Sequence, residues 1–229
     1  GEKGYRQIDI NLGCPFPMIA GKHKGAGMLL YPAQVAEVLA PIAEYPEIQF
    51  SLKMRLGWEN ASECMVLVEL LNTLRLSRIA LHARTGKQQY KGHPDLEAFQ
   101  GFYELCQHPL YYNGGIESLS DIRQILTRFP LLKGVFIGRG LLSSPLLAKE
   151  FKGNETFLPE QRMSIYFAFH EELFSAYSQV LQGETQLLVK MKTLWEYFLP
   201  ETDRKLLKRI KKSTRLQQYT ESVKAIFTS

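Results

Sequence analysis

Residues 7–15 read Gln-Ile-Asp-Ile-Asn-Leu-Gly-Cys-Pro, and the pattern in this stretch repeats through the first half of the chain. Apolar and polar residues alternate, which is typical of a β-strand with one apolar face. Gly13 and Pro15 end the strand and place the thiol of Cys14 at its C-terminal end. In parallel sheets and barrels this end carries the ligand. Taken alone, the pattern also fits a buried structural cysteine.

Four more strand patterns follow, separated by segments with helical spacing of apolar residues. Strands are expected at 48–55, 78–82, 109–113 and 134–138, and helices at 32–43, 61–74, 95–106 and 120–128. This alternation predicts an α/β fold with a parallel sheet, and the regular repeat favours a TIM (β/α)8-type barrel over an open sheet. About five strands are expected, whereas a closed barrel needs about eight. We therefore predict a partial barrel.

From residue 157 onward the pattern is helical only. Helices are expected at 161–182, 185–198, 202–212 and 216–227, which predicts a small all-α antiparallel helical bundle. Residues 153–159 are the expected linker. The predicted domains are therefore a barrel domain over 1–152 and a helical domain over 159–229.

The charge of the chain is concentrated at its C-terminal end. The net charge is +5 over 229 residues, and residues 190–229 contain ten basic and four acidic side chains, a local charge of +6. The tail is therefore predicted either to bind a polyanion or to present a solvated basic helical face. If it binds RNA, residues 208–215 are expected to contact phosphates, so that substituting Lys208 and Lys211 should weaken binding.

Composition excludes several other classes of protein. No apolar run is long enough for a bilayer, and the first residues lack the apolar stretch of a signal peptide, so a soluble cytoplasmic protein is expected. The three cysteines have no CxxC spacing, which argues against a disulfide framework or a zinc site. Cys64 and Cys106 are expected to be buried. We expect no membrane contact and no metal, and a monomer.

Polar side chains follow or end each of the predicted strands. They are Cys14, Lys53 with Arg55, His82 with Arg84, Asn113, and Arg139. A buried lysine favours an anionic ligand or a salt bridge, and a lone histidine favours either a ligand contact or an ordinary polar contact. Gly134–Gly140 has the form of a phosphate site, although a tight turn with a surface arginine has the same pattern. Because the ends of parallel strands meet at one rim, we predict one site there.

Six motifs, taken in order, resemble the tRNA-dihydrouridine synthases. They are Asp-x-Asn-x-Gly-Cys-Pro at 9–15, Gly-Ala-Gly-Met-Leu-Leu at 25–30, Leu-Lys-Met-Arg-Leu-Gly-Trp at 52–58, His-Ala-Arg-Thr-Gly-Lys-Gln-Gln-Tyr-Lys-Gly at 82–92, Tyr-Asn-Gly-Gly-Ile at 112–116 and Gly-Arg-Gly-Leu at 138–141. The resemblance runs from about residue 7 to about residue 148. The basic helical tail is similar in length to the tRNA-binding domain of that family.

The resemblance implies an FMN-dependent enzyme that reduces uridine in tRNA to dihydrouridine, with NADPH as the electron donor. It implies that Cys14 is the general acid for C5 while reduced FMN delivers hydride to C6, a task that suits the ordinary acidity of a thiol. By motif, the cofactor-binding residues are Lys53, His82, Asn113, Gly114, Gly115, Gly138 and Arg139. The substrate-binding residues are Asn11, Arg55, Arg84 and Tyr90, with Lys208 and Lys211 on the tail.

The sequence also departs from the family pattern. Family members begin with further strands whose loops touch FMN, and those motifs do not occur in this chain. Two other functions therefore stay open: an FMN-barrel oxidoreductase acting on a free pyrimidine, and a flavin-free tRNA-binding fragment.

Overall fold

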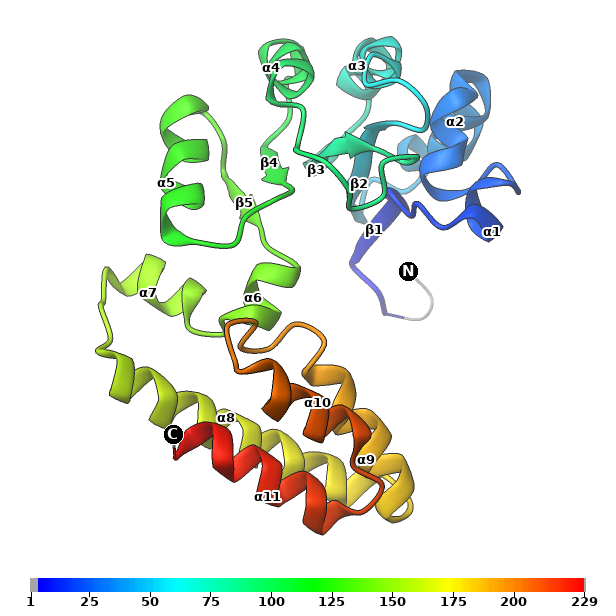
Figure 1. Cartoon of the computed structure of the whole chain (residues 1–229). Coiled ribbons are helices and arrows are strands. Elements are labelled where there is room, and N and C mark those ends of the chain that lie inside the picture. Colours follow the sequence, from blue (N-terminus) through cyan, green and yellow to red (C-terminus); the bar gives the residue numbers. More distant parts are fainter. Residues whose placement is uncertain (1–3, 229) are drawn as a thin grey trace. The chain divides into compact units, whose positions relative to one another are not determined.

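The computed structural model describes residues 4–228 and divides them into two compact units (Figure 1). The first unit holds the residues up to 116 together with 120–137. The second unit holds 117–119 and the residues from 138 onward. Residues 1–3 and 229, which the predicted domain bounds include, lie outside the described part. The bounds 1–152 and 159–229 therefore stay a prediction.

A five-stranded sheet forms the first unit. All its strands are parallel and lie in chain order, so that β1 and β5 are the two edges. The strands are β1 (Gln7–Leu12), β2 (Gln49–Gly57), β3 (Leu76–Thr85), β4 (Leu110–Asn113) and β5 (Gly134–Phe136). This arrangement confirms the predicted α/β fold with a partial barrel of five strands.

Helices connect the strands and line one face of the sheet (Figure 1). The α-helices are α1 (Pro17–Ala20), α2 (Pro32–Leu39), α3 (Glu63–Thr73), α4 (Leu96–Leu105) and α5 (Leu119–Arg128), and the 3-10 helices are η1 (Gly25–Leu30) and η2 (Ala40–Glu44). Pro32 begins α2, where its missing N–H costs no hydrogen bond. The carboxylate of Asp95 caps α4 by accepting a hydrogen bond from the Ala98 N–H at 2.9 Å.

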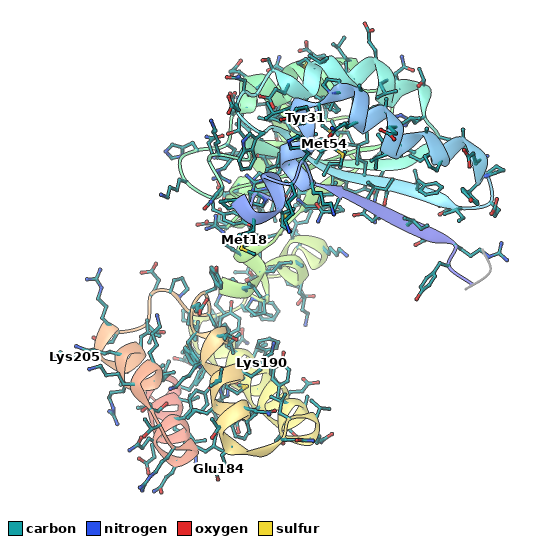
Figure 2. The ribbon with its side chains drawn as sticks, turned by 90° about the vertical axis from the view of Figure 1, so that its right-hand side faces the viewer. Met18, Tyr31, Met54, Glu184, Lys190 and Lys205 are labelled. Carbon is teal, nitrogen blue, oxygen red and sulfur yellow. The ribbon has the colours of Figure 1, made fainter. Side chains whose placement is uncertain are left out.

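The two faces of the sheet have different chemistry. Leu52, Met54 and Leu56 of β2 are buried on the helix-covered face, and Figure 2 labels Met54 there. The intervening residues Lys53 and Arg55 point to the opposite face, because successive side chains of a strand alternate. On that face the strand register places Asn11 beside Lys53, and Arg55 beside His82. The predicted site residues of β1, β2 and β3 therefore share one face of the sheet.

The second unit is helical. Its helices are α6 (Arg139–Ser143), α7 (Leu147–Gly153), α8 (Pro159–Val180), α9 (Gly183–Leu194), α10 (Arg204–Lys212) and α11 (Leu216–Phe227). Its core contains Leu146, Met191, Trp195, Ile210 and Tyr219. A helical tail was predicted, and the four long helices match it closely.

Some sequence-based boundaries were wrong. Strands β2 and β3 extend to Gly57 and Thr85, two and three residues beyond their predicted ends. Helix α7 was not predicted, and it ends at the first residue of the expected linker 153–159. Cys64 is buried as expected, whereas Cys106 is only partly buried because it follows the last turn of α4. Within residues 4–228, no helix is both long and apolar enough to cross a membrane.

Candidate functional site

The residues after β1 form the Cys14 loop, which we define as residues 13–16. The Asn11 side-chain oxygen accepts a hydrogen bond from the Gly13 N–H at 2.9 Å, and the Cys14 carbonyl accepts one from the Ala26 N–H at 3.0 Å. Gly25 packs against Cys14 with a φ of 56°, and a Cβ on Gly25 would lie 2.8 Å from the Cys14 Cβ. The loop is therefore fixed on two sides, and its half-buried thiol is free.

Lys53 lies beside this loop. Its ammonium nitrogen is 3.5 Å from the point that a Cβ on Gly13 would occupy. Burial and the neighbouring charge of Arg55 lower the pKa of Lys53, while Asp9 acts in the opposite direction. Asp9 accepts a hydrogen bond from the Ser51 hydroxyl at 2.5 Å. Because the Lys53 side chain is half-buried at the edge of the loop, its ammonium group offers a positive charge to an anionic ligand group.

Arg55 is deeply buried, with 1% of its surface exposed. Its Nε–H donates to the Gly13 carbonyl at 3.1 Å, and its Nη1 donates to the carbonyls of Thr85 at 2.8 Å and Gln89 at 2.7 Å. Burial lowers the pKa of Arg55, and the nearby Tyr90 opposes that shift. The guanidinium is thus engaged by backbone carbonyls, and its predicted contact with uridine stays a prediction.

His82, Arg84 and Tyr90 lie close together. The Arg84 Nη1 lies 3.2 Å from His82 Nε2, which makes Nε2 the acceptor and leaves the imidazole proton on Nδ1. Arg84 also donates to the Gly92 carbonyl from Nε at 3.3 Å and from Nη2 at 3.0 Å. The Tyr90 ring is half-exposed, and its centroid lies 6.4 Å from that of His82.

The turn after β4 approaches the same histidine. Gly114 and Gly115 have φ values of 127° and 63°, which favour glycine, and a Cβ on Gly114 would lie 3.2 Å from His82 Cδ2. The Asn113 side-chain amide donates to the Phe136 carbonyl at 2.7 Å and so joins β4 to β5. Gly138 and Arg139 belong to the second compact unit, at the start of α6. Their place beside the Asn113 turn stays a prediction.

The site thus combines an ammonium group and an imidazole on one polar face of the sheet with the thiol of the adjoining Cys14 loop. Such a set can hold an anionic planar ligand and deliver a proton to it. Among residues 4–228, no three His, Cys, Asp or Glu side chains form a candidate metal site.

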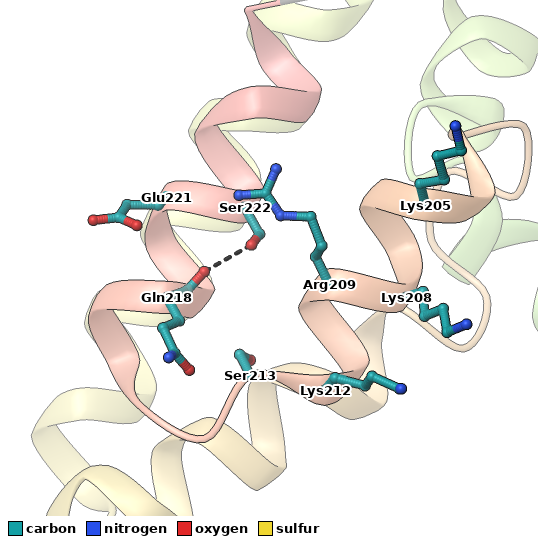
Figure 3. Close-up of a pocket in the computed structure, with 8 residues that line it drawn as sticks. All are labelled: Lys205, Lys208, Arg209, Lys212, Ser213, Gln218, Glu221 and Ser222. Atoms are coloured by element: carbon teal, nitrogen blue, oxygen red, sulfur yellow. Dashed lines mark hydrogen bonds between the residues drawn. The ribbon is translucent and has the colours of Figure 1, made fainter.

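The second unit contains a basic groove between α10 and α11 (Figure 3). Its volume is about 430 Å³, and its lining consists of Lys205, Lys208, Arg209, Lys212, Ser213, Gln218, Glu221 and Ser222. The four basic residues are spaced i, i+3, i+4 and i+7 and therefore share one face of α10. Of the two predicted tail residues, Lys208 lines the groove and Lys211 does not.

Sequence reasoning missed several of these residues. In the groove, Lys205 was missed, although its helical spacing to Lys208 was available in the sequence, whereas Arg209 and Lys212 lie within the stretch 208–215 that was predicted to contact phosphates. The role of Gly25 had no such signal, because its φ and its packing on Cys14 depend on the fold. The hydrogen bonds from Arg55 to backbone carbonyls could not be predicted either, because every residue has a carbonyl group and the residue type does not show which one is contacted.

Comparison with known proteins gives a consistent result. A family model described as "Dihydrouridine synthase (Dus)" matches residues 1–228. The tRNA-dihydrouridine synthase B of Vibrio vulnificus is 28% identical over 163 residues, which is 69% of this chain and 50% of that protein.

Two further relatives are described as probable tRNA-dihydrouridine synthases. The protein from Rhizobium leguminosarum is 32% identical over 63% of this chain and 45% of its own length. The protein from Rickettsia conorii is 24% identical over 77% of this chain and 55% of its own length. The chain spans about half the length of the curated relatives that it matches.

Proposed function

This chain belongs to the dihydrouridine synthase family, and on that premise we propose that it carries the proton-donating part of a tRNA uridine-reducing site together with an RNA-binding surface. The observation that carries the proposal is the grouping of Cys14, Lys53 and His82. The proposal is supported by the strand register, which puts Lys53 and His82 on one face of the sheet, and by the approach of Lys53 to Gly13 in the Cys14 loop.

The residues of this face fit FMN, on which the family generally depends. Lys53 offers a half-buried ammonium group, and the Gly114–Gly115 turn offers backbone without side chains next to His82. Lys53 and His82 would contact the flavin, while Asn113, Gly114, Gly115, Gly138 and Arg139 would hold its phosphate end. When bound, reduced FMN supplies the hydride for C6 of the uridine. NADPH is the proposed electron donor.

Cys14 is the proposed proton donor. Reduction of the uracil C5–C6 double bond requires one proton at C5 as hydride arrives at C6, and a thiol ordinarily titrates close enough to neutrality to provide it. Asn11 and Gly25 hold the backbone on both sides of the thiol. Asn11, Arg84 and Tyr90 line the proposed uridine side, with Tyr90 offering an exposed aromatic surface.

The groove between α10 and α11 is the proposed contact with the tRNA backbone. Lys205, Lys208, Arg209 and Lys212 form a continuous basic stripe, as phosphate binding requires. Lys211 lies outside the groove lining, so we place the main contact at Lys208.

One experiment tests the chemical and the RNA-binding parts together. The purified chain is given FMN, NADPH and tRNA that lacks dihydrouridine, and the product is measured by mass spectrometry of the nucleosides. Cys14→Ala should lower the rate by about 10² or more, because general acid catalysis is lost. Cys106→Ala, which changes a partly buried thiol at the end of α4, is the matched control and should leave the rate unchanged.

Groove variants form the second part of that experiment. Replacing Lys208, Arg209 and Lys212 together by Gln should weaken tRNA binding and lower the salt slope by about one for each phosphate contact. Lys211→Gln is the single-charge control for Lys208→Gln and should have the smaller effect.

Three results would overturn the proposal. Full activity in Cys14→Ala would exclude its role as the acid. Reduction of a free pyrimidine that is insensitive to salt would favour a small-molecule oxidoreductase. Salt-dependent binding of tRNA with no uptake of FMN would favour a flavin-free RNA-binding protein.

A further inference from the structure

Two buried arginines hold the loop between β3 and α4 through its carbonyl groups. We define residues 86–92 as the Tyr90 loop. Arg55 of β2 donates to the Gln89 carbonyl, and Arg84 of β3 donates to the Gly92 carbonyl. Arg55 and Arg84 are 1% and 5% exposed. Breaking the hydrogen bond between a carbonyl and a buried charged donor costs free energy, because both groups then lose their partner.

The two anchors leave Tyr90 little freedom. Gln89 adopts a left-handed φ of 51° and Gly92 a φ of 66°, so the backbone turns sharply at both anchored positions. Between them, the Lys91 N–H donates to the Gln88 carbonyl at 2.8 Å. The Tyr90 ring lies over the Arg55 guanidinium, with 5.4 Å from the guanidinium carbon to the ring centroid. Tyr90 is therefore presented at the surface in a fixed place beside His82.

Arg55 also contacts the Cys14 loop. Its Nε–H donates to the carbonyl of Gly13, the residue directly before Cys14, and its Nη1 donates to the Thr85 carbonyl at the end of β3. One rigid guanidinium thus joins the chain at Gly13 to the stretch from Thr85 to Gln89, which is about 70 residues away in sequence. Arg84 contacts His82 and Gly92.

We propose that Arg55 is a positioning residue that fixes the Cys14 loop and the Tyr90 loop relative to each other through the carbonyls of Gly13, Thr85 and Gln89. The proposal differs from a direct contact of Arg55 with substrate. The relevance of this proposal to catalysis rests on the proposed function of Cys14. The claim that Arg55 fixes the two loops does not depend on that function. It is therefore tested on the protein without ligand, where its failure and that of the proposed function are separable.

The experiment measures two properties of the full chain without tRNA or flavin. The first is hydrogen exchange of the Tyr90 loop, whose Gly86, Lys87, Gln89 and Lys91 N–H groups donate to backbone carbonyls. The second is the rate at which iodoacetamide alkylates Cys14, measured by peptide mass spectrometry. Cys64 is fully buried and Cys106 lies outside the site, so each provides an internal reference.

Arg55→Lys should raise both rates by about tenfold, because an ammonium group cannot bridge three carbonyls in the planar geometry of a guanidinium. Arg84→Lys should raise exchange in the Tyr90 loop while leaving Cys14 alkylation unchanged. Arg78→Lys is the matched control: Arg78 is an exposed arginine of β3 over the Phe136 ring, and its substitution should change neither rate.

The outcomes separate the possible roles of Arg55. Unchanged exchange and alkylation in a folded Arg55→Lys variant would overturn the proposal and favour direct substrate contact. Equal effects of Arg55→Lys and Arg84→Lys on Cys14 would also overturn it, because the coupling would then not be specific to Arg55. If Arg55→Lys does not fold, the Arg84 variant still decides whether the two loops respond independently.

Discussion

Gly25 shows how a single residue without a functional group shapes the site. Its φ of 56° lies in the left-handed region, and its Cα hydrogen faces the Cys14 backbone and side chain. The next residue, Ala26, donates its N–H to the Cys14 carbonyl. A side chain at Gly25 would meet both the strained backbone and the Cys14 Cβ, so the position of the thiol depends on a glycine here.

Gly25→Ala is therefore expected to destabilise the first unit by about 2 kcal/mol or more, through left-handed strain and overlap with Cys14. Urea unfolding monitored through Trp58 measures the change, in a Trp195→Phe background that removes the second tryptophan.

The same substitution at Gly101 is the control. Gly101 lies within α4, and a Cβ there would meet only Met65 atoms at 3.7 Å. Gly101→Ala should stabilise the unit by about 0.5–1 kcal/mol, because alanine is the better helix former. Equal effects of the two substitutions would show that the Gly25 backbone is not constrained by Cys14.

At the scale of helices, the second unit is held together by a buried hydrogen-bonded chain. Trp195 Nε1 donates to the Tyr219 hydroxyl at 2.9 Å, and that hydroxyl lies 2.7 Å from His170 Nε2. His170 Nδ1 lies 3.0 Å from the Glu171 carboxylate. Since an ionised carboxylate only accepts, Nδ1 carries the proton and Nε2 accepts from the Tyr219 hydroxyl. The chain joins α8, the end of α9 and α11 around a neutral imidazole.

The stability of this unit should therefore fall with acidification. Burial lowers the pKa of His170, and Glu171 only partly opposes that shift. Between the pKa of His170 in the folded chain and its pKa in the unfolded chain, the unfolded chain binds more protons. The contribution of His170 to the free energy of unfolding is therefore fully present above about pH 6.5 and declines below it. The slope contributed by one group is at most about 1.4 kcal/mol per pH unit.

Urea unfolding of a Trp58→Phe variant, followed through Trp195 from pH 5 to 8, measures that decline. Adding His170→Gln should make the free energy of unfolding depend less steeply on pH, whatever the substitution does to that free energy at pH 8. An unchanged slope would assign the acid sensitivity to other groups.

Sequence patterns predicted the elements better than their contacts. The alternation of apolar residues in β2 predicted both a strand and the side on which Lys53 and Arg55 lie, because a strand has a period of two. What Arg55 does there was not predictable, since its partners are carbonyls of Gly13, Thr85 and Gln89. The basic stripe on α10 was fully encoded, because helical spacing alone brings its side chains together.

At the scale of the whole chain, the segment before α8 contacts the helical unit. The Ser144 hydroxyl lies 2.7 Å from that of Tyr166, and the buried Glu150 carboxylate accepts a hydrogen bond from Arg162. Leu146 is part of the core of the unit. These contacts join α6 and α7 to α8, although composition alone placed the start of the helical domain at residue 159.

A fragment of residues 138–229 should therefore be more stable than one of residues 159–229, by about 2 kcal/mol or more, because the shorter one loses a buried apolar side chain and two polar partners of α8. Thermal unfolding followed by circular dichroism compares them. Within the longer fragment, Glu150→Gln should lower the melting temperature by several degrees. Lys149→Gln, at an exposed pair with Glu155, should have little effect. Equal stability of the two fragments would instead support residue 159 as the boundary and remove α6 and α7 from the helical unit.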